Sequence, residues 1–424
     1  MKRILAVVLL LVLALRVAAA KDTAAEEAKL RTQVAAEVAK AAAACIAAGA
    51  KTESEKLVAE ATALDPAAPG VADAKDKSEA LDADAAGADA AAAKARAAAR
   101  SAVAKLYDKL AALDHEAKDD ARFDGYLMRA LEWEPKPRAA GVVKKAKDGL
   151  DSPQPWTGAR LLAKLRKADP EGTKAGKYDA IDIDLGKSNK LMLASADELL
   201  VAWVSLPKDW ARGKKYPVLV GVEGAGCSFQ GYFNASVAAR GSRSVIVVTP
   251  VSLSNANVLD PKTFPMYPAD VLTKFAAQGD RPAFDGPGVQ AILDDLEARF
   301  GAEPRAFQTG FSGGGMFTYW RTFMHPDKVR GAAPCCGNFN PSLVNGAPEV
   351  KDGGPPVHIF TGEKDGYRDH VGSEPGIEAQ SDNAQELMKK LGYTRIQRTM
   401  VQGAGHSALH AQVWEFVDEV LRAK

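Results

Sequence analysis

The stretch that most constrains this chain is residues 305–316, where a short apolar run enters a G-x-S-x-G motif at residues 310–314. A serine at a sharp strand-to-helix turn takes a strained backbone conformation, and flanking glycines relieve the crowding that side chains would cause. The residues that follow, through Phe323, have helical character, and the amino end of a helix presents free N–H groups. The motif therefore predicts a nucleophile elbow with Ser312 exposed at the turn and the Gly313 N–H as the first oxyanion donor. The motif alone also fits a flexible turn, and the flanking strand and helix patterns favour the nucleophile.

The bulk composition excludes some classes of function. The chain has 424 residues, of which 47% are hydrophobic and 26% charged, enough for a large core and more than one domain. A formal net charge of +1 gives no electrostatic reason to expect nucleic acid or an acidic membrane surface as a partner. The four cysteines are too few for a disulfide scaffold and match no zinc spacing.

The first twenty residues predict an export signal. Lys2 and Arg3 give the positive start, residues 4–15 an apolar core too short to span a bilayer, and residues 18–20 a small-residue cleavage site. An amphipathic or buried terminal helix is the alternative. We expect a secreted or periplasmic protein, with no membrane span in the mature chain because no later apolar run is long enough.

Residues 21–150 differ in composition from the rest. Alanine, lysine and glutamate dominate, which predicts helix throughout. Residues 57–66 resemble residues 126–135, as in tetratricopeptide-type helical hairpins that end at a proline. This all-α, tetratricopeptide-like region is either a module with a protein partner or an alanine-rich spacer without one.

A proline-rich segment then marks a domain boundary, and we assign residues 151–177 as a linker and residues 178–424 as a second domain. After the linker, strand-like and helix-like patterns alternate, which predicts an α/β layer architecture with a mostly parallel sheet. Continuous apolar runs indicate strands buried on both faces, whereas the alternation in residues 181–185 indicates a half-buried edge strand. The predicted strands are residues 181–185, 199–206, 217–222, 245–248, 307–311, 331–334, 357–361 and 396–401, with helices notably at 289–300 and 384–391.

Two further polar residues follow predicted strands at the sheet edge where open α/β sheets bind ligands. Asp365 follows the strand at 357–361, and His406 follows the strand that ends near Val401. The chain order is serine, acid, histidine.

Residues from about 178 to the end resemble the α/β-hydrolase fold enzymes, in particular the group of secreted polyhydroxybutyrate depolymerases, feruloyl esterases and dienelactone hydrolase-like proteins. The resemblance rests on Lys214-Lys215-Tyr216-Pro217, on Gly310-Phe311-Ser312-Gly313-Gly314, on Gly362-Glu363-Lys364-Asp365 and on Gly405-His406-Ser407.

The resemblance implies a serine hydrolase without metal or organic cofactor that cleaves small-molecule or polymeric esters. Ser312 would be the nucleophile, His406 the base and then acid, and Asp365 the group that orients the imidazole. Asp369 is an alternative to Asp365, and His410 is a further candidate near His406.

The oxyanion loop departs from the family pattern. Glu223 stands where the family usually has histidine, followed by Gly224-Ala225-Gly226. We expect the Ala225 N–H to be the second donor, with Gly226 as the alternative. Because a carboxylate near the oxyanion would oppose it, we expect Glu223 to anchor the loop through hydrogen bonds directed away from the pocket.

Three cysteines follow strands that should flank the serine. Cys227 paired with Cys335 or Cys336 would fit an exported protein, and three free thiols are an equal alternative. Phe229, Tyr232, Phe233 and Tyr267 line either a substrate pocket or the core, and core packing is the favoured interpretation.

Three hypotheses follow. The first is an exported serine esterase that works through an acyl-enzyme. The second is a prolyl-oligopeptidase-like peptidase, which would require a propeller. The third is a helical interaction protein whose hydrolase domain is catalytically silent. The intact serine, acid and histidine argue against it, whereas Glu223 keeps it open.

Overall fold

The computed structural model describes residues 2–117, 126, 129–130, 133, 155–197, 199–255, 259–277, 281–372 and 374–423, with the backbone alone at 2–23, 113–117, 168 and 374. The chain divides into two compact units. The first comprises Met1–Val142 and Lys164–Pro170, and the second comprises Val143–Ala163 and Glu171–Lys424.

The first unit is all-helical where it is described, as the composition predicts. Its helices are α1 (Lys2–Ala47), α2 (Lys51–Leu64), α3 (Val71–Glu79) and α4 (Ala88–Ala117). The helix interfaces are rich in small residues, which let helix axes approach closely. Their buried core includes Val34, Ala35, Val38, Ala42, Leu57, Ala61, Val103 and Leu110.

Polar contacts also tie this unit together. The carboxylate of Glu60 on α2 accepts hydrogen bonds from the Tyr107 hydroxyl at 2.6 Å and from the Trp133 indole at 3.0 Å. Arg96 on α4 pairs with Glu53 at 2.6 Å and lies over the Trp133 ring. These contacts make the region a packed helical unit rather than loose coil.

The backbone of α1 continues through the segment predicted as the export signal. Among the described residues, no helix is both long and apolar enough to cross a membrane. The second of the two similar segments, 126–135, lies mostly outside the described residues, so the repeat itself stays a prediction.

The segment predicted as a linker contains two helices, α7 (Pro155–Ala168) and α8 (Pro170–Lys174). The prediction of an edge strand at 181–185 is wrong, because these residues belong to helix α9 (Asp179–Lys187). The buried residues Asp179, Asp182 and Leu185 recur every three positions, a spacing that places them on one face of a helix. Asp182 is buried and pairs with Arg299, whereas Asp184 is exposed, so the two acidic positions do not share one solvent face.

The second unit is built on an eight-stranded sheet in the order β1-β2-β4-β3-β5-β6-β7-β10. The β1–β2 and β2–β4 pairs are antiparallel, and all other pairs are parallel. Its strands are β1 (Leu191–Ala194), β2 (Val201–Ser205), β3 (Val218–Val222), β4 (Ile246–Pro250), β5 (Ala306–Phe311), β6 (Val329–Cys335), β7 (Val357–Gly362) and β10 (Ile396–Val401). All predicted strands except 181–185 are therefore confirmed, and β1 was not foreseen.

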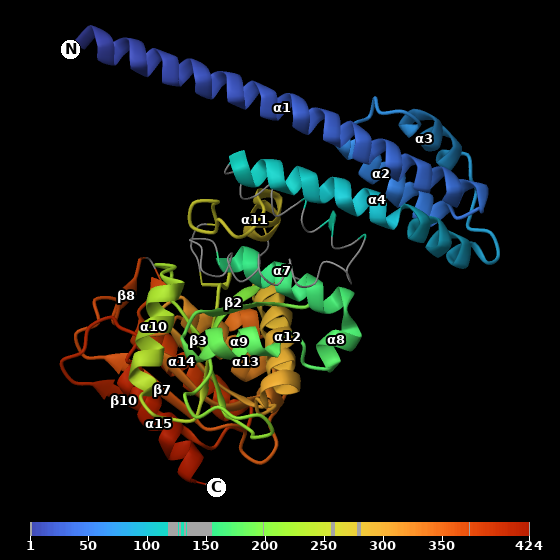
Figure 1. Cartoon of the computed structure of the whole chain (residues 1–424). Helices are drawn as coiled ribbons and strands as arrows, with labels where there is room; N and C mark the ends of the chain where they lie inside the picture. The colour runs from blue at the N-terminus through green and yellow to red at the C-terminus, as the bar shows by residue number, and fades with distance from the viewer. Residues whose placement is uncertain are drawn as a thin grey trace. The chain divides into compact units, whose positions relative to one another are not determined.

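Helices cover both faces of the sheet. Along β5, Phe307 faces Phe416 of α15, whereas Gly310, of opposite parity, faces Thr318 of α13. The α10–α15 pair packs on one face and the α12–α13 pair on the other (Figure 1). The helices are α10 (Phe229–Arg240), α11 (Ala269–Ala276), α12 (Pro282–Phe300), α13 (Gly314–Met324), α14 (Ile377–Lys390) and α15 (His410–Arg422), with short 3₁₀ turns at Pro326–Lys328 and Pro341–Val344. The unit has the predicted α/β-hydrolase fold, with its elbow after β5.

A small hairpin, β8 (His370–Val371) with β9 (Glu374–Pro375), belongs to the loop between β7 and α14. The parallel strands all end at one edge of the sheet, so the loops after β3, β4, β5, β6, β7 and β10 meet there. This edge carries the candidate site.

Candidate active site

The G-x-S-x-G segment forms the strained elbow that its sequence predicts. Ser312 has a φ of +51°, in the left-handed region that residues with a Cβ rarely adopt. A Cβ at Gly310 would overlap the Gly314 carbonyl, and a Cβ at Gly314 would overlap the Val222 carbonyl. Both motif glycines are therefore required by close backbone packing around the serine.

Backbone hydrogen bonds hold the elbow in place. The Ser312 N–H donates to the Cys335 carbonyl at 3.2 Å. The Ser312 carbonyl accepts from the N–H groups of Gly315 and Asn338, both at 2.9 Å. These contacts link the serine to β6 and to the first turn of α13, and this rigidity offsets the local backbone strain.

The structure brings Asp365 and His406 into direct contact. His406 Nδ1 lies 3.0 Å from Oδ1 and 2.9 Å from Oδ2 of Asp365, whose side chain is fully buried. Oδ1 also accepts from the Tyr367 N–H at 2.8 Å. A carboxylate can only accept, so Nδ1 is the donor, and Nε2 is left as the basic nitrogen.

The alternative candidates lie elsewhere. Asp369 is 72% exposed and contacts Arg368. His410 begins α15 and packs its ring against Tyr232, at 4.8 Å between ring centroids, and burial lowers its pKa to about 4. His410 is thus a neutral packed side chain at ordinary pH, outside the serine pocket.

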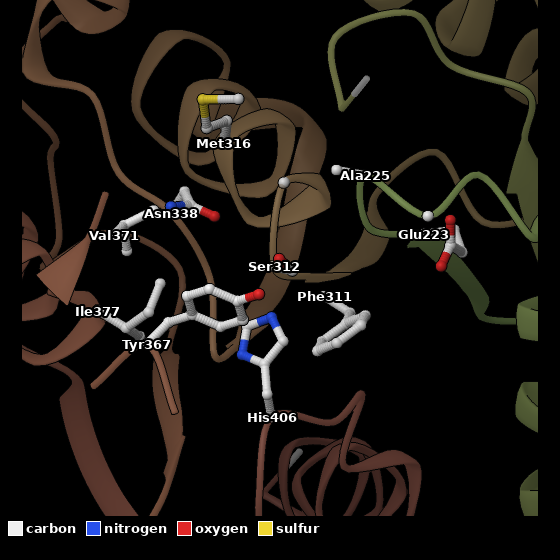
Figure 2. Close-up of a pocket in the computed structure, with 12 residues that line it drawn as sticks. Glu223, Ala225, Phe311, Ser312, Met316, Asn338, Tyr367, Val371, Ile377 and His406 are labelled. Carbon is white, nitrogen blue, oxygen red and sulfur yellow. The ribbon is translucent and has the colours of Figure 1, made fainter. Parts of the chain in front are cut away.

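The imidazole of His406 is held between two aromatic rings. Its centroid lies 4.7 Å from that of Phe311 and 4.8 Å from that of Tyr367. Figure 2 shows the ring extending from the chain toward Ser312, with Phe311 and Tyr367 on either side. Ser312 and His406 line one pocket of about 410 Å³.

The backbone N–H groups of Ala225 and Gly313, the predicted oxyanion donors, line the same pocket and have no acceptor in the described part of the chain, and the N–H of Gly226 is likewise without one. A Cβ at Gly313 would lie 3.4 Å from the Ala225 nitrogen, so the two segments are in contact. Free amides beside a nucleophile can stabilise negative charge on a substrate oxygen. Gly226, the alternative donor, also lines the pocket.

Glu223 is buried at the base of this loop. Its Oε2 accepts from the Ser228 N–H at 3.0 Å, just before α10 begins. Burial raises the pKa of Glu223, and hydrogen bonds from backbone N–H groups oppose this rise. In Figure 2 its carboxylate lies on the far side of the Ala225 loop from Ser312. The side chain therefore anchors the loop, as expected, although it also lines part of the pocket.

Asn255 is a site residue that the sequence analysis missed. Its Nδ2 donates to the carbonyls of Glu223 at 2.7 Å and Gly224 at 3.1 Å, which orients the oxyanion loop. Asn255 is itself held by the turn after β4, where Asp285 accepts from the N–H groups of Leu253 and Ser254. Its place beyond the carboxyl end of β4 is a signal that could have identified it.

Asp285 predicts a specific pH dependence of stability. Burial raises its pKa to about 6, above the usual value near 3.8. The folded protein then holds this proton more tightly than the unfolded chain, so the stability contribution of Asp285 falls as pH rises from about 4 to about 6. Asp285→Asn should therefore gain about 2 kcal/mol relative to wild type between pH 4 and pH 6, measured by urea unfolding at both ends. A difference between the two proteins that does not change with pH would contradict this.

The remaining pocket lining comes from loops and helices that the sequence did not single out. It includes Met316 of α13, Asn338 after β6, Tyr367 and Val371 from the β7–α14 loop, and Ile377 of α14 (Figure 2). The aromatic candidates Phe229, Tyr232, Phe233 and Tyr267 are buried and do not line this pocket, as the favoured core interpretation holds.

All four cysteines are free, so the alternative with free thiols is confirmed and no bridge joins Cys227 to Cys335 or Cys336. Cys336 is buried behind the acid and histidine, and its Sγ, a ring nitrogen of His406 and a carboxylate oxygen of Asp365 lie within 4.8 Å of one another. Such a trio could hold a soft metal ion. The 2.9 Å contact between Nδ1 and Oδ2 is, however, already a good hydrogen bond, so the pair needs no ion.

Comparisons with known proteins find similarity to solved esterase and hydrolase structures. Esterase PE8 is 19% identical, with 51% of this chain and 97% of that chain covered and a TM-score of 0.38. Esterase 2 of Thermogutta terrifontis is 19% identical, with 53% and 88% covered and a TM-score of 0.37. Poly(aspartic acid) hydrolase-1 of Sphingomonas sp. KT-1 is 15% identical, with 52% and 92% covered and a TM-score of 0.38. No protein-family model and no curated protein matches the chain.

Proposed function

We propose that this chain is an exported serine hydrolase that cleaves carboxylic esters through an acyl-enzyme. One observation carries the proposal. The amides of Ala225 and Gly313, which have no acceptor in the described part of the chain, line the same pocket as a serine in a strained elbow and a histidine bonded to a buried aspartate.

In the proposed reaction, the Ser312 oxygen attacks the ester carbonyl while His406 Nε2 accepts the hydroxyl proton. The two free amides bind the oxyanion, and the imidazolium is stabilised by the buried carboxylate of Asp365. His406 then returns the proton to the departing alcohol. Water repeats the sequence on the acyl-enzyme and releases the acid, so no cofactor is required.

The pocket suggests the size of substrate. Its volume of about 410 Å³ lies at the small end for ligand sites, and Phe311, Met316, Val371 and Ile377 give it apolar walls. Tyr367 stands at the mouth with half of its surface exposed. We therefore infer short, uncharged acyl groups.

The two alternatives have less support. A prolyl-oligopeptidase-like peptidase would need a propeller, whereas the described part of the first unit is helical. A catalytically silent domain does not account for the free amides or for the oriented imidazole. The proposal of export rests on the signal predicted at residues 1–20. We also propose that the helical unit binds a protein partner.

The test is incubation of the full chain with a fluorophosphonate probe and with p-nitrophenyl esters of increasing chain length. We expect covalent labelling and fastest turnover of the short esters. Amide analogues should turn over far more slowly. Fast peptide cleavage would favour the peptidase, and absence of both labelling and turnover would favour the silent domain.

Glu223→Gln tests the anchoring role of the buried carboxylate. Glutamine keeps an oxygen that can accept the Ser228 N–H, so the loop should hold its shape. We expect kcat/KM on p-nitrophenyl acetate to change by less than about threefold, whereas Glu223→Ala, which leaves that amide unpaired, should lower it by about tenfold or more. A several-fold gain in the glutamine variant would mean that the native carboxylate opposes the oxyanion.

A further inference from the structure

A second pocket, of about 450 Å³, lies between α12 and α13 in the second unit. It shares no lining residue with the serine pocket. The side chains that define it are Pro287, Gln290, Trp320, Arg321, His325 and Lys328. Among the described residues, the lining thus carries two side chains that are cationic at neutral pH, Arg321 and Lys328, and no acid.

One wall of this pocket is a fixed aromatic surface. A Cβ at Gly286 would overlap the Trp320 ring, so the glycine lets the indole lie directly on α12. Trp320 also stacks on Phe317, at 5.6 Å between ring centroids, and meets the edge of His325 at 5.1 Å. The apolar wall is therefore preformed.

Arg321 is the unusual residue of this pocket. It is 2% exposed, yet no carboxylate among the described residues lies within ion-pair distance of it. Its Nη2 donates to Gln290 Oε1 at 2.7 Å, while its Nε has no hydrogen-bond partner in the described structure. Burial lowers the pKa of Arg321 to about 10, and the more distant Asp327 and Asp294 act in the opposite direction.

A buried guanidinium with unused donors destabilises the folded protein unless an anion pairs with it and accepts its hydrogen bonds. The nearby carboxylates are otherwise engaged, since Asp294 accepts from the Gln290 amide at 2.7 Å and Asp327 lies 3.7 Å from Lys328. A planar carboxylate fits the guanidinium fork best, and the adjoining Trp320 and Pro287 favour an apolar group behind it.

We propose that this pocket is a binding site for a small monocarboxylate with an aryl or alkyl body. The carboxylate pairs with Arg321, Lys328 at the rim adds attraction, and the apolar body packs on Trp320. The site is independent of the proposed esterase activity because it uses none of the same residues.

Calorimetric titration of phenylacetate into Ser312→Ala protein tests the site without turnover. Phenylacetamide, which keeps the ring and loses the charge, and inorganic phosphate, which lacks the ring, are the matched ligands. We expect saturable binding of phenylacetate, with both controls weaker by about tenfold or more. Arg321→Met in the same background should weaken phenylacetate by a similar factor, and Lys328→Gln by about threefold or less.

Three results would overturn the site. They are no saturable binding, equal binding of phenylacetamide, and undiminished phenylacetate binding by a folded Arg321→Met protein, which would place the ligand elsewhere. If the methionine variant does not fold, Arg321→Lys is used to test whether phenylacetate binds at this position. It keeps the charge but loses the fork, so weaker phenylacetate binding supports the site and unchanged binding rejects it.

Discussion

Replacing Ser312 by alanine is expected to abolish labelling by a fluorophosphonate and to lower kcat on short p-nitrophenyl esters by about 10⁵-fold or more. The hydroxyl oxygen is the atom that would form the acyl-enzyme, and no neighbouring group can substitute for it in the pocket as described. The remaining activity would come from the free amides and from substrate binding alone. Alanine is smaller than serine and should not disturb the elbow, which is fixed by backbone hydrogen bonds.

The matched control is Ser407→Ala. Ser407 directly follows the histidine, and its hydroxyl contacts only the Gly405 carbonyl, at 3.5 Å, in the described structure. This variant should keep both labelling and turnover within about twofold. Labelling that survives in the Ser312 variant and disappears in the Ser407 variant would move the nucleophile and reject the proposed mechanism.

Much of the sheet was predictable because its inner strands are buried on both faces. Runs such as Val218–Val222 and Ile246–Pro250 contain almost no polar residue, and such continuous patterns occur where helices cover a sheet on each side. The same logic failed at α9, where Asp182 reads as a solvent-facing position. Its burial depends on Arg299, more than a hundred residues away, and no local pattern reveals that pairing.

In the candidate site, too, some residues could be predicted from local sequence patterns and others could not. Ser312, Asp365 and His406 could be predicted because each follows a strand, and parallel strands end at one edge. Tyr367 and Val371 could not be predicted, because their positions depend on how the long β7–α14 loop folds back over the pocket. The absence of the Cys227 bridge was equally hidden, since pairing depends on a separation that sequence does not contain.

The second large effect is expected from Asp365→Asn, with kcat reduced by about 10⁴-fold near neutral pH. The carboxylate accepts twice on Oδ1, from Tyr367 N–H at 2.8 Å and from His406 Nδ1 at 3.0 Å, and once on Oδ2, from Nδ1 at 2.9 Å. Asparagine has a single oxygen, and the buried Tyr367 amide is best satisfied when that oxygen stays at Oδ1. Its NH₂ group then replaces Oδ2 and donates to Nδ1.

An Nδ1 that accepts a hydrogen bond puts the imidazole proton on Nε2, where it blocks proton transfer from Ser312. The positions of the active-site side chains are preserved while the basic nitrogen is lost. Substrate binding should therefore change little, and the loss of activity should appear as a lower kcat. Asp369→Asn, an exposed neighbour, should keep kcat within about twofold, as measured by steady-state hydrolysis of p-nitrophenyl acetate. A loss of less than about tenfold for Asp365→Asn would mean that the buried acid does not set the tautomer of His406, and the proton-transfer role proposed for that histidine would fall with it.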